Sequence, residues 1–288
     1  MGAAVAAMAS LQTSDDPGAT AQTIAACFSV ATVVLLATGA LRTRERPEYQ
    51  AHATPPPRQA LRDVARNPHA RIVIGVMAID SLSFSMMGVL FPFIAAYVLP
   101  GDTISSSYVA VAITAAVVLF PSWFLLARRL GKRAAWLTAL CMRIAGFAAI
   151  LFVGPETTWL TGIALFLVGG SLACNFIIPP SIKSDVIDYD ELMTGDRKEG
   201  SYFAAWNLVQ KLASGAAIGI SGLALQVVGY EANAVQDPTT TSAMLLLFAG
   251  VPLLLHLIAV PLLLRLRLDA REHERIRNAL AHPRGVGA

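Results

Sequence analysis

Seven long apolar stretches constrain this chain more than any other feature. A bilayer core about 30 Å thick is crossed by a helix of about 20 apolar residues. The stretches of this length are Ala21–Leu41, Ile72–Leu99, Ile104–Ala127, Ala134–Val153, Thr158–Ile178, Tyr202–Gly229 and Ala243–Leu264. They lack the alternation of β-strands and are about twice as long as a barrel strand. The sequence therefore predicts an all-α polytopic membrane protein with seven transmembrane helices.

The composition agrees with a chain that lies largely in lipid. Charged residues make up 14% of the sequence and hydrophobic residues 55%, whereas a soluble domain carries about 25% charged residues. A net charge of +3 is too small to indicate a nucleic-acid partner. Cys27, Cys141 and Cys174 fall inside apolar stretches, without metal-site spacing, and we interpret them as small packing residues.

The basic residues alternate along the chain and so predict its orientation. Four segments, 42–71, 128–133, 183–198 and 265–284, hold 20 of the 22 Lys and Arg residues. The connections between them and the N-terminal tail hold none. Because cytoplasmic connections are enriched in positive charge, we expect a multi-pass protein of the plasma (inner) membrane. Its N-terminus would lie outside and its C-terminus in the cytoplasm.

Two of the cytoplasmic segments carry helical patterns. RQALRDVARN follows the proline-rich TPPPR, which would stop a helix that arrives from upstream. Asp269 and Glu272 have the spacing of a capping box ahead of Ile276 and Leu280. We expect each segment to form a solvated surface helix rather than a partner-binding device.

Three ionisable residues lie inside predicted spans: Asp80, Arg143 and Lys211. An ionisable group at bilayer depth costs at least about 2.5–3.5 kcal/mol, so it usually faces a partner or a water-filled cavity. All three lie close to the predicted midplane, which suggests one buried polar layer. They could form a structural ion pair of Asp80 with one cation. The second cation would then be left for a substrate or a coupled ion to neutralise.

The span around Lys211 carries a polar stripe. Residues that share this face at helical spacing are Phe203, Asn207, Gln210, Lys211, Ser214 and Ser221, with Trp206 at the edge. Gly215, Gly219 and Gly222 on the neighbouring face predict the close approach of another helix.

Two other polar residues leave alternatives open. His256 suits either a packing histidine or a proton relay, and Asn175 could line a cavity or satisfy backbone groups freed by Pro179 and Pro180.

An acidic connection follows the fifth predicted span and carries a family resemblance. Its acids are Asp185, Asp188, Asp190, Glu191 and Asp196. PPSIKSDVIDYDELMTGDRKEG, followed by a helix with Trp, Lys and a terminal GY, resembles the signature of glycoside-pentoside-hexuronide:cation symporters. These are the melibiose-permease-like branch of the major facilitator superfamily. Further landmarks in matching order are RERPE, RNPHARIVI, LARRLGKR and LDAREHERIRNALA.

The resemblance implies that this chain corresponds to the sixth helix and the C-terminal six-helix half of a twelve-helix transporter. The expected parts are an extracytoplasmic tail (1–20), a transmembrane helix (21–41), a central cytoplasmic loop (42–71), a six-helix bundle (72–264) and a cytoplasmic tail (265–288). Lys211 falls where melibiose-permease-like proteins carry a functionally important lysine. The resemblance implies no cofactor and places the Na⁺ or H⁺ site in an N-terminal half that the chain lacks. That half, present as a separate chain, would be a partner.

We therefore expect a sugar or glycoside:cation symporter that works by alternating access. The expected substrate-binding residues are Lys211, Asn207, Trp206, Asp80, Arg143 and Asn175. The expected cytoplasmic gate pairs Asp185, Asp188 and Asp190 with Lys132, Arg133 or Arg197. Expected partners are a small-molecule sugar and the bilayer, with no nucleic acid.

Two alternatives to a sugar symporter stay open. The substrate could be a lysolipid or another amphiphile, because fold does not fix substrate. The chain could also be a truncated, non-transporting membrane protein. We expect no enzyme, because HExxH, GxSxG, P-loop and paired catalytic carboxylate patterns do not occur within a span.

Overall fold

The computed structural model describes residues 17–42, 57–97, 102–153, 157–231, 234–268 and 270–281. These residues form helices and contain no β-strand, which confirms the all-α prediction. Seven helical stretches among them are long and apolar enough to cross a membrane. The chain divides into two compact units, residues 1–54 and 55–288, and each is described separately.

The first unit contributes one described helix, α2 (Pro17–Arg42). It covers the predicted first span, and its candidate membrane window holds no buried residue within the structure. The hydroxyls of Thr23, Ser29, Thr32 and Thr38 each donate to the carbonyl four residues earlier. An apolar helix can therefore carry these hydroxyls without exposing an unpaired donor.

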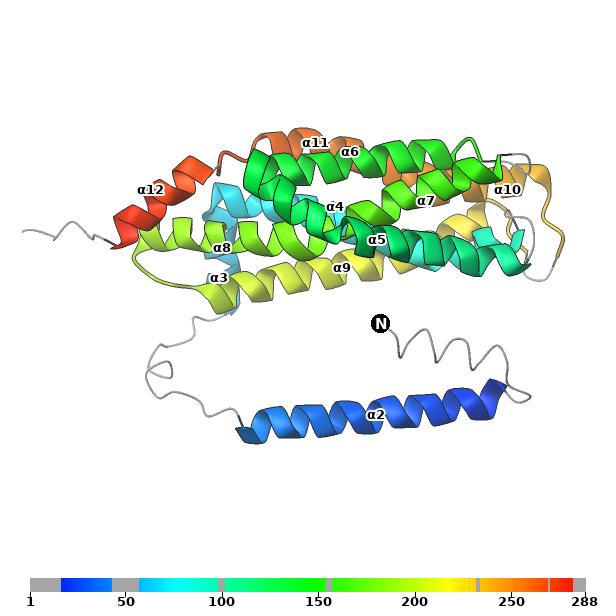
Figure 1. Ribbon diagram of the computed structural model, residues 1–288, viewed down its shortest axis with the longest axis horizontal. Coiled ribbons are helices and arrows are strands. Elements are labelled where there is room, and N and C mark those ends of the chain that lie inside the picture. Colours follow the sequence, from blue (N-terminus) through cyan, green and yellow to red (C-terminus); the bar gives the residue numbers. More distant parts are fainter. Residues whose placement is uncertain are drawn as a thin grey trace, which may run out of the picture. The chain divides into compact units, whose positions relative to one another are not determined.

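The second unit is a bundle of helices (Figure 1). In chain order they are α3 (Pro57–Arg66), α4 (Pro68–Tyr97), α5 (Asp102–Leu130), α6 (Lys132–Ile150), α7 (Thr158–Leu172), α8 (Cys174–Thr194), α9 (Glu199–Val227), α10 (Pro238–Leu245), η2 (Leu246–Gly250), α11 (Val251–Leu264) and α12 (Ala270–Ala281). The last span is continuous from α10 to α11 through η2, a single π-helical turn. Each of the six spans predicted after residue 71 coincides with such helices.

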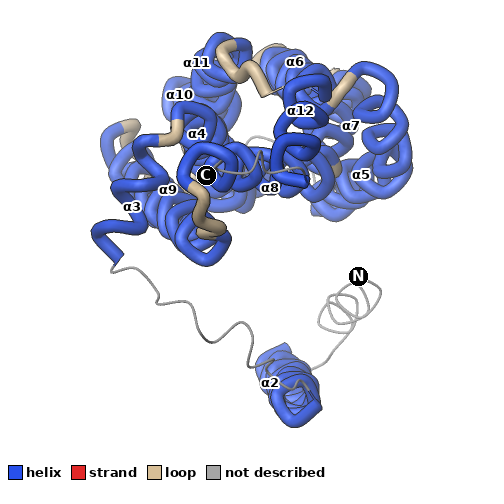
Figure 2. The backbone as a smooth tube through the Cα atoms, turned by 90° about the vertical axis from the view of Figure 1, so that its left-hand side faces the viewer, coloured by secondary structure: helices blue, strands red, loops and turns tan. Residues whose placement is uncertain are grey.

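Helix α4 lies near the start of the bundle's sequence, but its main partners come from near the end of it. It packs against α9 and α11, whereas α7 packs between α5 and α6. The view along the bundle places α4, α9, α10 and α11 on one side and α5, α6 and α7 on the other (Figure 2). Contacts of α11 with α6, and of α8 with both α4 and α6, join the two groups.

Small residues set the closest helix approach, between α5 and α7. A Cβ atom on Gly169 would lie 2.3 Å from the Ala112 carbonyl oxygen. A Cβ on Gly146 of α6 would lie 2.7 Å from a methyl group of Val168. Glycine is needed at Gly169 because the backbone of Ala112 occupies the space of a side chain, whereas at Gly146 the nearest atom belongs to the Val168 side chain.

Asn67 and Pro68 mark the start of α4. The Asn67 Oδ1 atom accepts from the backbone N–H groups of His69 and Ala70, at 3.0 and 3.2 Å. Proline at the first helical position gives up no hydrogen bond there. The Asn67 amide also donates to the Tyr202 hydroxyl at 2.9 Å and to the Val186 carbonyl at 3.2 Å. One buried side chain thus caps α4 and connects it to α8 and α9.

The acidic segment is helical, which corrects the prediction of a loop after Ile178. The helix is interrupted only at Ala173, which keeps a helical backbone conformation, and α8 then runs through Pro179 and Pro180 to Thr194. Each proline removes one backbone hydrogen bond, a loss that a helix packed in a bundle tolerates. The true connection is short and begins at Gly195, whose φ of 76° suits glycine at a helix C-terminus.

The two surface helices pack on the bundle instead of lying free in solvent. Val64 of α3 and Ile276 of α12 are both buried in its main apolar core. Glu272 lies in the first turn of α12. Asp269, the other half of the expected capping box, lies outside the described residues.

Candidate functional site

A buried ion pair joins α4 and α6 in the interior of the bundle. The Arg143 Nη1 atom lies 2.6 Å from the Asp80 Oδ1 atom, and the two side chains are 3% and 9% exposed. At such depth an isolated charge would be costly, and each member of the pair supplies the counter-charge of the other. The structure thus brings together two of the three ionisable residues expected in one layer.

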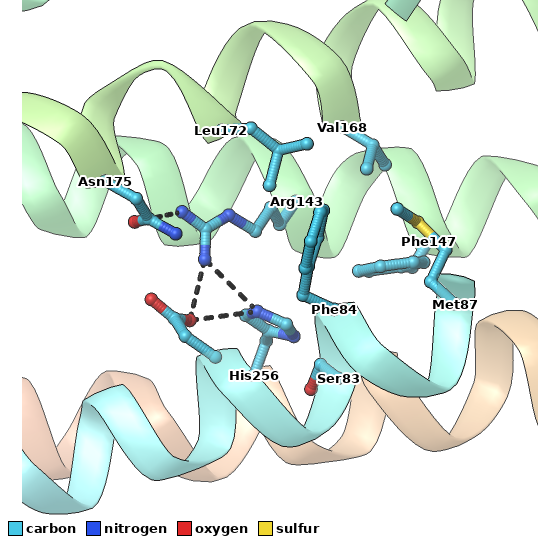
Figure 3. Close-up of a pocket in the computed structure, with 10 residues that line it drawn as sticks. Ser83, Phe84, Met87, Arg143, Phe147, Val168, Leu172, Asn175 and His256 are labelled. Carbon is cyan, nitrogen blue, oxygen red and sulfur yellow. Dashed lines mark hydrogen bonds and ion pairs between the residues drawn. The ribbon is translucent and has the colours of Figure 1, made fainter. Parts of the chain in front are cut away.

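The remaining donors of Arg143 are also occupied. Its Nε atom donates to the Ser171 hydroxyl at 3.0 Å, and its Nη2 atom donates to the Asn175 side-chain oxygen at 2.8 Å. Figure 3 shows the guanidinium between Asn175 and His256. Asn175 therefore serves a buried charge, and it also lines the small cavity beside this cluster, which was one of the two roles left open by the sequence.

His256 completes the cluster from α11. Its Nδ1 atom lies 2.7 Å from the Pro252 carbonyl oxygen, which can only accept, so Nδ1 carries the hydrogen. Its Nε2 atom lies 3.3 Å from Asp80 Oδ1 and 3.4 Å from Arg143 Nη1. Nε2 can therefore accept from the guanidinium when neutral and donate to the carboxylate when protonated. The side chain is 1% exposed, as a hydrogen-bonded packing histidine would be.

The space beside this cluster is small. A cavity of about 10 Å³ lies among Asp80, Ser83, Arg143, Asn175 and His256, and about one water molecule fits a volume of that size. The Ser83 hydroxyl is buried there without a hydrogen-bond partner. A sugar ring does not fit this space, so substrate contact with Asp80, Arg143 or Asn175 would need a different arrangement of the bundle.

Lys211 does not join the buried pair, which corrects the expectation of three charges in one layer. It is exposed on α9, and it forms no ion pair with any residue that the structure describes. Helix α9 contacts α4 through other residues, including a hydrogen bond of 2.9 Å between the Ser214 and Ser85 hydroxyls. The expectation that Lys211 faces the interior of the bundle was wrong, because counting residues along a helix does not give the direction of a side chain around its axis.

The other two expected substrate residues on α9 have different surroundings. Asn207 is exposed on the same face as Lys211, whereas Trp206 is 1% exposed. The Lys183 ammonium lies 5.1 Å from the centre of the Trp206 ring, a cation–π contact between α8 and α9. Trp206 is therefore part of the core rather than of the exposed face.

The glycine face of α9 is open. A Cβ atom on Gly215, Gly219 or Gly222 would meet no atom within 4 Å. Within the described part of residues 55–288, no helix approaches these glycines. Together with Asn207 and Lys211, the glycines belong to a broad exposed surface of α9.

The expected gate residues form ion pairs within the bundle. The Lys132 ammonium lies 2.6 Å from Asp185 Oδ2, and the Arg197 Nη1 atom lies 3.7 Å from Asp188 Oδ1, so both expected pairs are present. Arg197 lies closer to Glu191, at 2.8 Å. Arg197 also pairs with Glu199. Arg133 instead donates to the Leu264 carbonyl at 2.6 Å, so it holds the end of α11 and pairs with none of the three gate acids.

Two further contacts connect α8 to the surface helices. The His273 Nε2 atom of α12 lies 3.3 Å from Asp185 and 3.2 Å from Asp188. The Lys198 ammonium lies 3.5 Å from Asp63 of α3 and 3.8 Å from Asp190. Through these ion pairs, the acids of α8 connect α3, α12 and the α5–α6 turn at one end of the bundle (Figure 1).

Sequence reasoning missed several of these polar residues. His273 and Lys183 lie in charged segments that read as solvated surface. Ser171 is a single hydroxyl in an apolar span, and nothing in its surroundings marks it as a ligand of Arg143. Asn67 did carry a signal, because Asn followed by Pro ahead of an apolar run is a helix-start pattern.

Comparison with known proteins places the chain. A sequence profile described as MFS/sugar transport protein matches residues 1–270. The chain belongs to this family. The match supports the major facilitator superfamily, and the melibiose-permease-like branch stays a prediction.

The curated relatives are symporters and transporters. The sodium-dependent lysophosphatidylcholine symporter 1-B of Danio rerio is 24% identical over 68% of this chain and 38% of its own length. A symporter of Synechocystis is 31% identical over 46% of this chain and 25% of its own length. The sphingosine-1-phosphate transporter MFSD2B of Mus musculus is 28% identical over 54% of this chain and 32% of its own length. The matches span about half or less of the length of these relatives.

Proposed function

We propose that this chain forms the C-terminal bundle of a secondary transporter for a lysolipid or a similar phosphate-bearing amphiphile. Family membership supports transport. Relatives named for lysophosphatidylcholine and sphingosine-1-phosphate favour an amphiphile over the sugar or glycoside expected from the sequence. The observation that carries the proposal is the exposed surface of α9, where one cation lies among apolar side chains.

That surface suits a molecule with a phosphate in its headgroup and a hydrocarbon tail. Around Lys211 the exposed side chains include Phe203, Leu208 and Leu212, at 45%, 44% and 64% exposure. Lysophosphatidylcholine and sphingosine-1-phosphate both combine a phosphate with a long chain. A lysine can pair with the phosphate while the apolar residues contact the chain, and pairing in a low-dielectric site is stronger than in water.

The same surface is a weaker match for a sugar. Sugar recognition requires several convergent hydrogen-bonding groups around one ring. On this face Asn207 and Lys211 are the exposed polar side chains, and the Ser214 hydroxyl is already bonded to Ser85. The buried cluster around Arg143 has space for about one water molecule.

Transport would follow alternating access, in which one bundle rocks against a second with substrate held between them near the midplane. Residues 55–288 form one bundle, and the open face of α9 would meet the other. Acids Asp185, Asp188 and Asp190 would act at the gate by fixing the end of α8. We assign the Na⁺ or H⁺ site to residues outside the described bundle, because Arg143 already pairs with Asp80. The basic end of the bundle would face the cytoplasm.

Ligand binding to the purified chain tests this proposal. A fluorescent lysophosphatidylcholine should bind to the chain in a neutral detergent and be displaced by the unlabelled lipid. Lys211→Gln should weaken binding about tenfold, the effect of about 1.4 kcal/mol, and Lys211→Arg should retain most of it. Arg277→Gln, an exposed change of equal charge on α12, is the matched control.

Two results would contradict the proposed function. A glycoside such as melibiose that displaces the fluorescent lipid completely would return the substrate to the sugar class. Unchanged binding in Lys211→Gln would show that the exposed face of α9 does not hold the headgroup.

A further inference from the structure

A second cavity lies at the turn between α5 and α6, far along the bundle from the α4–α6 ion pair. It has a volume of about 800 Å³. Its charged lining residues are Arg128, Arg129, Lys132, Arg133, Asp185 and His273. Four basic side chains therefore surround the cavity with a single carboxylate.

Most of this positive charge has no carboxylate partner among the described residues. Lys132 and Asp185 pair with each other. Arg133 is held by a carbonyl group rather than a carboxylate, and its Nε atom is buried without a hydrogen-bond partner in the part of the chain that the structure describes. The Arg128 guanidinium lies 5.7 Å from the centre of the Phe124 ring. Within the described residues, Arg128, Arg129 and Arg133 have no carboxylate at ion-pair distance.

The cavity lies where a membrane helix meets its interface. Candidate spans end at Leu130 on α5 and begin at Lys132 on α6. The last turns of α5 expose Phe124, Leu125 and Leu130, at 54%, 54% and 61%. The exposed apolar side chains of α5 thus adjoin Arg128 and Arg129. Lipid phosphates lie beside acyl chains at such an interface.

We propose that this cavity binds the phosphate group of an anionic phospholipid, with Arg128 and Arg129 as its principal ligands. Guanidinium groups present paired N–H donors that match two phosphate oxygens. The unpartnered Arg133 Nε adds a donor at the cavity wall. The acyl chains lie along Phe124 and Leu125, which distinguishes a lipid from a soluble phosphate. The bound lipid braces the turn from which Lys132 holds Asp185.

This site is separate from the exposed face of α9. It lies on α5 and α6, and none of its lining residues belongs to α9. If the lipid site were disproved, the proposed transport substrate would be unaffected. If the proposed substrate were disproved, the lipid site would be unaffected.

Lipid binding to the purified full chain tests the proposal. A short-chain phosphatidylglycerol and the phosphatidylcholine of equal chain length would be titrated separately into detergent-solubilised protein. Native mass spectrometry would count bound lipid, and tryptophan fluorescence would follow the thermal midpoint. We expect phosphatidylglycerol to bind at least about tenfold more tightly, which corresponds to about 1.4 kcal/mol. The midpoint should rise with phosphatidylglycerol only.

Matched variants locate the binding. Arg128→Gln/Arg129→Gln should abolish the preference for phosphatidylglycerol, because it removes both guanidinium groups and their paired N–H donors. Arg275→Gln/Arg277→Gln makes the same change of charge on α12, outside the cavity lining, and should keep the preference. Equal loss in both variants, or equal binding of the two lipids by the unmodified chain, would overturn the proposal. Inorganic phosphate separates the sources, because complete displacement of phosphatidylglycerol by millimolar phosphate would overturn the assignment to a lipid.

Discussion

Arg143 on α6 and Asp80 on α4 form an ion pair of 2.6 Å, and both side chains are more than nine-tenths buried. The pair crosses between the two groups of helices in the bundle. His256 contacts both of its members from α11. The pair therefore connects three helices through one carboxylate oxygen and one guanidinium nitrogen.

Removing one member of this pair should cost more than removing both. Asp80→Ala leaves Arg143 buried without its counter-charge, and such a loss destabilises by about 3–5 kcal/mol. Asp80→Ala/Arg143→Met should recover a large part of the loss, because no unpaired charge remains. Thermal or denaturant unfolding of the three proteins in detergent measures this. A double variant as unstable as the single one would contradict the pairing.

The acids of α8 should act on different helices. Asp185→Asn/Asp188→Asn removes the partners of His273, so hydrogen exchange should accelerate in α12. Asp190→Asn removes a partner of Lys198 near Asp63 and should accelerate exchange in α3 instead. Mass spectrometry of peptic fragments resolves the two regions. Equal acceleration of both helices by either variant would show that this end of the bundle loosens as one piece.

The contact of α5 with α7 should be sensitive to a single methyl group. Gly169→Ala places a Cβ atom 2.3 Å from the Ala112 carbonyl oxygen, so the helices must separate. We expect a loss of about 1–3 kcal/mol, the usual cost of overpacking. Gly162→Ala on the same helix meets no atom within 4 Å, so it should be neutral or slightly stabilising. Equal unfolding midpoints for the two variants would refute this account of the contact.

Asp237 caps α10, and its contribution should depend on pH. Its Oδ1 atom accepts from the Thr240 backbone N–H at 2.6 Å. Hydrogen bonds from Thr240, and then from Thr239, hold the pKa of the Asp237 carboxyl below its usual value. A depressed pKa means that the stabilisation is present above the unfolded-state pKa of about 3.9 and is lost as pH falls through the lower folded-state value.

The comparison with Asp237→Asn isolates this effect. Asparagine also caps helices but does not titrate, so the difference in thermal midpoint from the unmodified chain should shrink as pH falls from 6 to about 3. Asp237→Ala should lower the midpoint at neutral pH, because it removes the cap. A pH-independent difference between Asp and Asn would rule out the charge contribution.

Helix positions could be predicted from the sequence because span length and charge alternation follow from the bilayer itself. The pairing of Asp80 with Arg143 was also within reach, since one acid at bilayer depth seeks a cation. Lys211 was misplaced because residue counting gives depth and not direction, and the direction of α9 is fixed by its packing on α4. The helical acidic segment was missed because Pro179 and Pro180 look like a stop when their packed surroundings are unknown.

The contacts of Asn175, Ser171 and His273 could not be predicted at all. Each joins residues from separate helices, and their sequence neighbours carry no trace of the partner. Asn175 was identified only as polar and close to prolines, whereas its partner, Arg143, lies 32 residues earlier.

The order of α4 in the chain has a consequence for biogenesis. Its main partners α9 and α11 are among the last helices of the bundle to be made. Arg143 of α6, the ion-pair partner of Asp80, is made 63 residues after Asp80. Asp80 thus enters the membrane before any buried cation has been synthesised within the bundle, a state that costs at least about 2.5–3.5 kcal/mol. We expect the insertion of α6 to relieve this state, because Arg143 then pairs with Asp80. The contact of His256 with the pair forms only after α11 has been made.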